Sequence, residues 1–276
     1  AACFEWATGL PRKRQFKMIS TAPIAKTYRA TAGRAALAEN FGDTDSYAFP
    51  GQPITIGQVS RQVALRRRIS EGSATPGEIA AFEATAAERE KALEAAIVTA
   101  AEDAVANRHR PIMISGLYTG MFRVAEAVRA KGYGGADFHA DNALNVGGGL
   151  KGVVLPPDYR EIILETFNIA PEHIAQGYAM QDINMVMPRC RSGRYHVPPT
   201  VIILPLDEHG DRLLATSGQT EGRAGFFDLT LDGRWGGLIS GDKVEVDFGR
   251  CTCGAQGPTV GGEITRYAEL PGGDKI

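Results

Sequence analysis

The chain has 276 residues, of which 43% are apolar and 22% are charged, as in a globular protein with a sizeable core. A net charge of −2 without a long basic run excludes the electrostatic footprint of a protein that binds nucleic acid or anionic membranes. No apolar stretch reaches the roughly 20 residues that cross a bilayer, and no signal-peptide core opens the chain, so we expect a cytoplasmic protein.

The first clear element in the chain is a long helix. Residues 1–50 give no definite pattern, and the chain begins at Ala1 rather than at a methionine, which suggests that upstream material was processed or is missing. At Thr75, Thr-Pro-Gly-Glu forms a capping box with proline at the first helical position. Apolar residues at near-helical spacing then predict one or two amphipathic helices up to about Asn107: Ile79, Phe82, Ala86, Leu93, Ile97 and Ala101.

The next segments alternate between short apolar runs and amphipathic helices. The pattern predicts strands at residues 111–116, 143–146 and 174–178, and helices at 120–131 and 157–167. Strands that are separated by glycine turns and helices favour a parallel sheet with crossover helices.

The character of the sequence changes after Tyr195. Residues 200–204, 223–229 and 243–247 are β-type runs separated by Gly and Asp turns, which predicts a meander or small barrel without helices. The expected fold is therefore α/β, a layered parallel sheet with crossover helices followed by a β-rich subdomain. We expect an α/β domain over residues 1–196 and the β-rich subdomain over 197–276.

Three short motifs fit nucleotide chemistry, and each also has an ordinary structural explanation. Gly147–Gly149 follows a predicted strand, where glycines let the backbone approach a ligand, although a tight turn explains them equally well. An aromatic and an acid four residues apart, Tyr178 and Asp182, can stack a base and hold Mg²⁺, or pack at a strand end and cap a helix. In Ser-Gly-Asp242 the acid suits a ribose diol, while turn chemistry alone also accounts for the motif.

Cysteine and histidine spacing indicates a metal site. Cys251 and Cys253 form a tight pair, and Cys190 lies close to His196 in a Gly-containing segment. Three thiolates and one imidazole complete a tetrahedral zinc shell, which would be structural because no position stays open. The alternative is a set of free, partly buried thiols.

Taken in order, these motifs resemble the phenylacetate–CoA ligase branch of the adenylate-forming enzymes. The Gly-Gly-Gly-Leu-Lys-Gly run is also similar to the acyl-protein synthetases of bacterial luciferase operons. The resemblance extends from about Phe16 to Tyr267 and is strong from Pro111 onward. Five motifs carry it: Gly147–Gly149, Tyr178-x-x-x-Asp182, Cys190 with Tyr195-His196, Ser240-Gly-Asp242 and Cys251-x-Cys253-Gly.

The resemblance implies a role for each motif in binding ATP. The Gly-rich turn of the family lines the adenine and acyl pocket, which corresponds to Gly147, Gly148 and Gly149. The family's aromatic residue stacks on adenine and its acid holds magnesium, which correspond to Tyr178 and Asp182.

Further positions follow from the same alignment. Gln181 stands where the family has a hydroxyl residue that touches the phosphate, Asp242 matches the ribose-binding acid, and Arg266 matches a hinge-region arginine. The cysteine and histidine positions match a zinc-site pattern of phenylacetate ligase-like relatives.

The sequence also departs from the family. The Ser/Thr/Gly-rich phosphate loop has one candidate, Thr31-Ala-Gly33-Arg34-Ala-Ala, which has lost most hydroxyls and its last glycine, so Arg34 would have to supply charge instead. The small C-terminal domain that carries the lysine for adenylation is missing. The resemblance therefore implies a chain that is incomplete at the N-terminus and lacks that domain.

The sequence favours an acid–thiol ligase-like enzyme. A small carboxylic acid would attack the α-phosphate of ATP to give acyl-adenylate and pyrophosphate, and the thiol of CoA or of a carrier protein would take the acyl group. Asp182 with Mg²⁺ and Arg34 would carry the catalytic charge neutralisation. The alternative is a non-catalytic nucleotide-binding or acyl-adenylate-binding relic domain in an assembly, and a homo-oligomer or a partner subunit is compatible with either.

Overall fold

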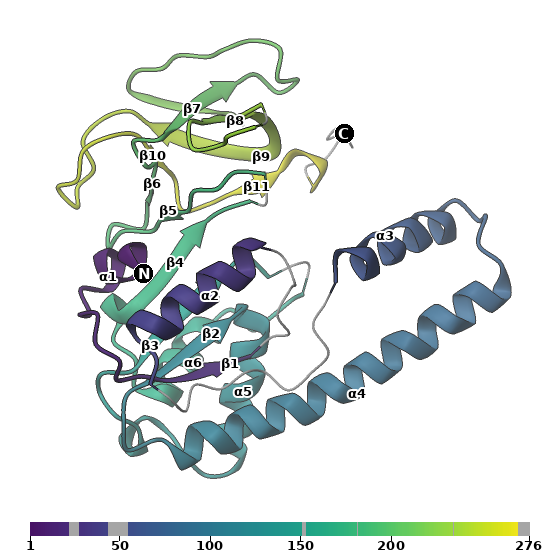
Figure 1. The fold of residues 1–276 in the computed structure, drawn as a ribbon, viewed down its shortest axis with the longest axis vertical. Helices are drawn as coiled ribbons and strands as arrows, with labels where there is room; N and C mark the ends of the chain where they lie inside the picture. The colour runs from purple at the N-terminus through teal and green to yellow at the C-terminus, as the bar shows by residue number, and fades with distance from the viewer. Residues whose placement is uncertain (22–27, 44–54, 151–152, 181, 234, 270–276) are drawn as a thin grey trace. The chain divides into compact units, whose positions relative to one another are not determined.

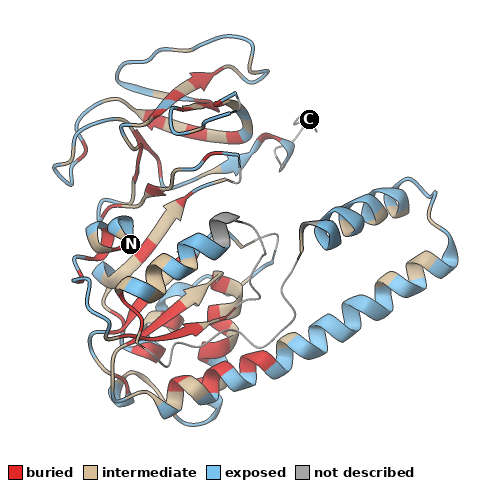
Figure 2. Ribbon diagram, viewed as in Figure 1, coloured by how far each residue is buried: buried red, intermediate tan, exposed pale blue. Residues whose placement is uncertain are grey.

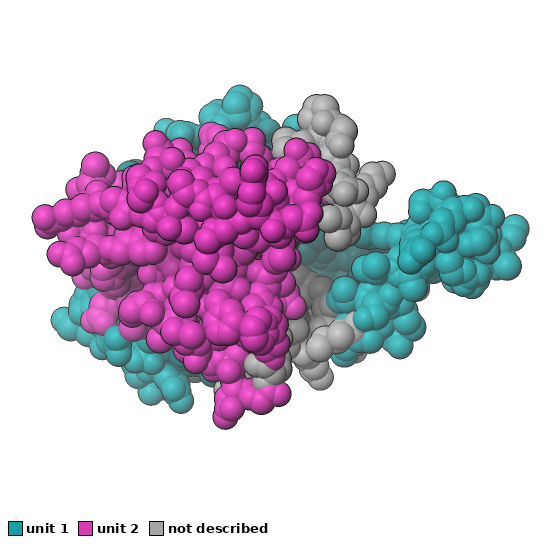
Figure 3. Space-filling view, turned by 90° about the horizontal axis from the view of Figure 1, so that it is seen from above, with its two compact units in different colours: residues 1, 10–174 teal, residues 2–9, 175–276 magenta. Residues whose placement is uncertain are grey.

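The computed structural model describes residues 1–21, 28–43, 55–150, 153–180, 182–233 and 235–269. Contacts divide the chain into two compact units, which Figure 3 colours separately. Unit 1 contains Leu10–Ile174 with Ala1, and unit 2 contains Ala175–Ile276 with Ala2–Gly9. The domain boundary expected between residues 196 and 197 stays a prediction.

The centre of unit 1 is a parallel sheet. Strands β1 (Lys17–Ser20), β2 (Ile112–Gly116) and β3 (Ala143–Gly147) lie side by side in that order. Their middle residues are fully buried, with Ile19 opposite Ile114. Such near-continuous apolar runs are typical of parallel strands that are covered on both faces.

Helices pack around this sheet as the sequence predicts. Helix α4 runs from Pro76 to Ala106, with the expected capping box at Thr75 before it and Asn107 as its C-cap. Helices α5 (Tyr118–Ala130) and α6 (Tyr159–Phe167) follow β2 and β3 and contribute buried apolar residues to the same core. Short 3₁₀ turns, η1 (Gly135–Asp137) and η2 (Pro171–His173), lie between the larger elements.

Two helices of unit 1 have no counterpart in the sequence predictions. Helix α2 (Tyr28–Asn40) follows β1, and helix α3 (Ile56–Ser70) precedes α4. Figure 2 shows that α3 and the first half of α4 are exposed on most of their surface. Their weak amphipathic patterns explain why neither helix was predicted.

Unit 2 is a β-rich body with one N-terminal helix. Helix α1 (Ala2–Thr8) contacts β5, and β4 (Ile174–Tyr178) pairs with β5 (Met187–Pro188) in antiparallel fashion. A second, antiparallel sheet has the strand order β6-β10-β9-β8-β7, with β11 on β9. Its members are β6 (Tyr195–His196), β7 (Val201–Leu206), β8 (Gln219–Asp228), β9 (Gly237–Asp247), β10 (Thr259–Val260) and β11 (Thr265–Arg266), and the turn η3 (Tyr267–Glu269) follows.

The fold class expected from the sequence is confirmed. A parallel sheet with crossover helices is followed along the chain by antiparallel strands, as Figure 1 shows. The predicted strands at 111–116, 143–146 and 174–178 correspond to β2, β3 and β4 within one or two residues. No helix among the described residues is long and apolar enough to cross a membrane.

Candidate functional site

Three residues that the resemblance assigns to nucleotide binding meet in unit 2. Tyr178 stands at the end of β4, and its hydroxyl donates a hydrogen bond to Asp242 Oδ2 over 2.7 Å. Arg266 on β11 is registered opposite Asp242, and its Nε lies 3.5 Å from Asp242 Oδ1. One carboxylate thus has a protein partner on each oxygen.

A β-bulge places Asp242 at this position. Opposite β8, the register of β9 shifts so that the residues between Ile239 and Lys243 face a shorter stretch of the neighbouring strand. Ser240 lies in this bulge, where its hydroxyl donates to the Ala224 carbonyl and accepts from the Asp242 amide. Turn chemistry, the alternative explanation of this motif, therefore does not place Asp242: a bulge in a continuous strand re-aims the carboxylate.

The Tyr178 ring lies in the core of unit 2. It is only 8% exposed and packs near Tyr195 and Phe226 with ring centroids 6.0 Å apart. Burial and the negative charge of Asp242 raise the pKa of the Tyr178 hydroxyl, so the group stays protonated and acts as a donor. An adenine that stacks on this ring would therefore need a rearrangement around Tyr178.

The acid expected to hold magnesium follows Tyr178 closely. Asp182 is exposed, and it belongs to no group of three or more potential metal ligands among the described residues. Mg²⁺ in nucleotide sites commonly takes one or two carboxylates together with phosphate oxygens and water, so a single acid suffices chemically. Gln181 lies outside the described residues.

The glycine turn lies in unit 1 at the carboxyl end of β3. Gly147, Gly148 and Gly149 are all exposed, and Gly148 has a left-handed φ of +92°. An added Cβ at Gly149 would meet nothing within 4 Å, so open space surrounds this backbone. The carboxyl end of parallel strands is where ligands usually bind in open α/β sheets.

The segment expected to be the phosphate loop has a different structure. Thr31, Gly33 and Arg34 all lie inside helix α2, so the expectation of a loop is wrong. Alanines at three of the six positions 31–36 favour the helix, because alanine has the highest helix propensity. Thr31 and Gly33 are exposed, while Arg34 is half-buried, and burial lowers the pKa of its guanidinium.

The four predicted zinc ligands form one cluster in unit 2. The ligand atoms of Cys190, His196, Cys251 and Cys253 all lie within 4.8 Å of one another. Cys190 Sγ and Cys251 Sγ are 3.8 Å apart, and Cys253 Sγ is 3.3 Å from His196 Nε2. The only remaining cysteine, Cys3, is exposed and outside this group.

Two tight turns bring the thiols together. The Gly193 amide donates to the Cys190 carbonyl, and the Gly254 amide donates to the Cys251 carbonyl. Both glycines have left-handed φ angles, +78° and +93°, that other residues rarely adopt. The sequence signal was thus a pair of Cys-x-x-Gly turns in addition to the cysteines themselves.

The cluster has the dimensions of a tetrahedral zinc shell. With Zn–S of about 2.3 Å and Zn–N of about 2.0–2.1 Å, tetrahedral geometry gives S···S near 3.8 Å and S···N near 3.6 Å. The sulfur–sulfur distance agrees, and the sulfur–nitrogen distance is only slightly short. Burial, followed by the nearby charge of Arg194, lowers the pKa of His196, which favours the neutral imidazole that binds metals.

One neighbour of the cluster gave no signal in the sequence. Trp6 on α1 contacts the His196 ring edge-on, with centroids 5.1 Å apart. Phe4, Ala7 and Thr8 of the same helix are buried. A helix of seven residues carries too little periodicity to be predicted, so this contact becomes visible only in three dimensions.

Comparisons with known proteins agree on the fold. No protein-family model matches the sequence, and neither does any curated protein. Among solved structures, an open conformation of 2-hydroxyisobutyryl-CoA ligase in complex with 2-HIB-AMP and CoA matches with a TM-score of 0.60 and 14% identity. The match covers 97% of this chain and 48% of the ligase, so the chain spans about half of that protein's length.

Other matches are weaker. A fatty acyl CoA synthetase of Mycobacterium tuberculosis matches 97% of this chain and 47% of its own, at 12% identity and a TM-score of 0.45. MatB of Rhodopseudomonas palustris matches 60% of this chain and 36% of its own, at 15% identity and a TM-score of 0.41. At these identities the first match establishes a shared fold, and the other two are too distant to add to it.

Proposed function

We propose that this chain belongs to the adenylate-forming superfamily and activates a small carboxylic acid with ATP. The observation that carries the proposal is the ligase fold over 97% of the chain, combined with the meeting of Tyr178, Asp242 and Arg266. These three residues were assigned to one nucleotide from sequence motifs that lie far apart. Residues of a common site are expected to converge in this way.

In the proposed reaction the carboxylate of the substrate attacks the α-phosphate, and acyl-adenylate and pyrophosphate form. The thiol of CoA or of a carrier protein then takes the acyl group and AMP leaves. Asp242 would accept the ribose hydroxyls, for which a carboxylate has enough lone pairs even while it accepts from Tyr178. Asp182 would hold Mg²⁺, which neutralises phosphate charge, and Gly147–Gly149 would line the adenine and acyl pocket.

A second function is favoured by helix α2. Because Thr31, Gly33 and Arg34 are helical, no described segment presents the donors of a phosphate loop in the expected place. A domain that binds a nucleotide or an acyl-adenylate without forming it would not need that loop. Such a relic domain would have the same fold as the enzyme but would not catalyse formation of the acyl-adenylate.

Pyrophosphate exchange distinguishes the two functions. The protein is incubated with ATP, Mg²⁺, labelled pyrophosphate and each member of a panel of short aliphatic, branched, hydroxy and aromatic acids. An enzyme returns label to ATP with at least one acid, and Asp182→Asn lowers that exchange. Absence of exchange with every acid, together with saturable binding of AMP, would establish the relic function.

We further propose that Cys190, His196, Cys251 and Cys253 hold one structural zinc ion. The support is the tetrahedral spacing of four soft or borderline ligand atoms on two tight turns. All four positions are filled by protein, so the metal would join two distant parts of unit 2 and take no part in the reaction. Elemental analysis of freshly purified protein tests the content, and a zinc content far below one equivalent contradicts the site.

A further inference from the structure

The connection between β4 and β5 carries Asp182, the acid proposed to hold Mg²⁺. Asp182 itself is exposed, whereas the residue after it, Ile183, is 1% exposed and belongs to the apolar core of unit 2. Met180 and Met185 pack against the same core. The acid therefore lies between anchored neighbours, on a segment that cannot move away from the core without exposing apolar side chains to water.

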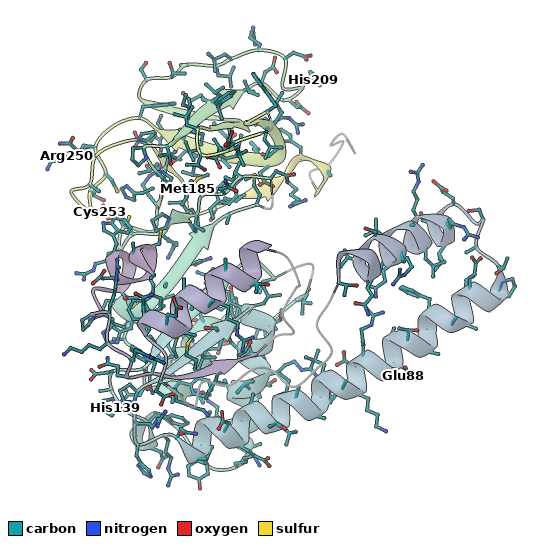
Figure 4. The ribbon with its side chains drawn as sticks, in the orientation of Figure 1. Glu88, His139, Met185, His209, Arg250 and Cys253 are labelled. Carbon is teal, nitrogen blue, oxygen red and sulfur yellow. The ribbon has the colours of Figure 1, made fainter. Side chains whose placement is uncertain are left out.

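A buried carboxylate holds the backbone of this connection. Asp228, the last residue of β8, is 1% exposed, and its Oδ2 accepts a hydrogen bond of 2.6 Å from the Asn184 amide. The amide of Met185, which Figure 4 labels in unit 2, donates to the same carboxylate. Two consecutive amides just after Asp182 thus share one acceptor, although that acceptor is 44 residues away from Asn184 in the sequence.

The other oxygen of the Asp228 carboxylate is held by Thr230. Asp228 Oδ1 accepts from the Thr230 amide over 2.9 Å and from the Thr230 hydroxyl over 2.6 Å. Asn184 Nδ2 donates in turn to the Thr230 carbonyl over 3.3 Å. Burial alone raises the pKa of the Asp228 carboxyl, but the hydrogen bonds from Thr230 and the two amides outweigh it and leave the pKa below its ordinary value. The group is therefore an ionised acceptor with donors at both oxygens.

The backbone of Asp228 is itself held on two sides. Asp228 is registered opposite Val201 in the antiparallel sheet, and its amide donates to the Gly236 carbonyl over 3.0 Å. An added Cβ at Gly236 would lie 2.5 Å from the Asp228 carbonyl oxygen, so the two chain segments pass too closely for a larger residue. The connection that carries Asp182 is thus fixed to a strand of the sheet and not to another loop.

We propose that Asp228 is a positioning residue that fixes the backbone of the β4–β5 connection, so that the exposed carboxylate of Asp182 is already in place for Mg²⁺. The inference rests on the proposed function, in which Asp182 holds this ion beside the phosphates of ATP. A single carboxylate binds an ion better when its backbone needs no ordering at the moment of binding, because ordering costs conformational entropy. Asp228 is buried behind the connection and acts through Asp182, as the groups that orient metal ligands do.

Asp228→Asn tests the inference by isothermal titration of the full chain with ATP in Mg²⁺, with ATP in EDTA, and with AMP in EDTA. Asparagine keeps the shape of the side chain but offers one acceptor oxygen in place of two, so the donors at one of the two positions lose their partner. We expect the gain in ATP affinity that Mg²⁺ provides to fall by about tenfold, the effect of altering a group that orients a metal ligand. AMP, which lacks the outer phosphates, should bind as tightly as to the parent.

The double variant D182N/D228N separates positioning from a general loss of stability. If Asp228 acts through Asp182, Asp228→Asn should have no further effect on ATP binding once Asp182 is replaced by asparagine. Asp247→Asn is the matched control, because Asp247 Oδ1 also accepts a backbone amide, that of Gly249, over 2.8 Å. Strand β9 begins beside the end of β8, where Asp228 lies, and ends at Asp247, so the control alters the opposite end of the strand. It should leave the magnesium dependence unchanged.

Thr230→Val decides the question if Asp228→Asn does not fold. Thr230 is exposed, and the change removes only the hydroxyl bond to Asp228, so the gain from Mg²⁺ should fall by about threefold. A parent whose ATP affinity is independent of Mg²⁺ contradicts the magnesium role of Asp182 and this inference with it. With a magnesium-dependent parent, three results overturn the inference alone: a variant that keeps the full gain, one that loses affinity for ATP and AMP equally, or one that still weakens ATP binding in the Asp182→Asn background.

Discussion

The Cys/His cluster of unit 2 and the phosphate-loop candidate in helix α2 of unit 1 were both assigned from the same resemblance, with opposite structural results. The four cluster residues are distant in sequence and still lie within 4.8 Å of one another. The six residues 31–36 are contiguous and lie in a helix instead of the expected loop. In the proposed zinc site, side chains that must meet around one ion constrain the fold over long distances. The segment 31–36 has lost most hydroxyls and a glycine of the family's loop, and it no longer constrains even its own backbone.

Removal of one cluster ligand should have the largest effect. Cys190→Ser leaves three ligands in a partly buried site, so the zinc and the linkage that it provides should be lost. We expect a loss of about 4 kcal/mol or more and a decrease in Tm of about 10 °C or more. Cys3→Ser is the matched control because Cys3 is exposed and outside the cluster. An equal Tm for the two variants would show that the four residues are only a set of free thiols with a histidine and hold no metal.

Arg34→Ala tests whether the phosphate-loop candidate in helix α2 binds ATP. If Arg34 replaces the lost donors of the phosphate loop, ATP binding should weaken by about 1.5–3 kcal/mol, the value of a charge-assisted hydrogen bond. Binding of AMP, which lacks the outer phosphates, should change much less. Isothermal titration with both nucleotides measures the difference. An identical affinity of variant and parent for ATP would remove Arg34 from the site and strengthen the relic function.

Tyr178→Phe measures how much the Tyr178–Asp242 hydrogen bond contributes to the stability of unit 2. The variant loses the 2.7 Å bond to Asp242 and keeps the ring. Arg266 still pairs with the carboxylate, so we expect a loss of only about 1–2 kcal/mol in urea unfolding. Tyr133→Phe, in unit 1, is the control, because it keeps the ring beneath Arg108. A loss in the control as large as in Tyr178→Phe would mean that the Asp242 bond contributes nothing.

Gly33→Ala should change the stability least, and whether it stabilises or destabilises the protein is the informative result. An added Cβ at Gly33 meets nothing within 4 Å, and alanine favours a helix interior over glycine by about 0.5–1 kcal/mol. The variant should therefore be slightly more stable in thermal unfolding. Destabilisation, or a marked loss of ATP affinity, would indicate that residues 31–36 leave the helix and bind phosphate as a loop.

The sequence predicted the elements that carry strong local signals. The capping box at Thr75 and the Gly turns around the cluster fix backbone geometry with few residues, and both were placed correctly. The Tyr178–Asp242 bond was not predictable, because a bulge in β9 aims the acid and a bulge has no clear sequence code. Helix α3 was also missed, because its amphipathic pattern is weak.

Helix α1 has a consequence for how the chain is made. Residues 2–9 belong to unit 2, although all other residues of that unit follow Ile174. During synthesis, Trp6 leaves the ribosome long before His196, its neighbour in the finished fold, so this segment must wait while unit 1 is completed. Docking of the N-terminal segment therefore cannot begin until residues beyond Ile174 have been made, and closing so long a loop adds to the entropic cost of that step.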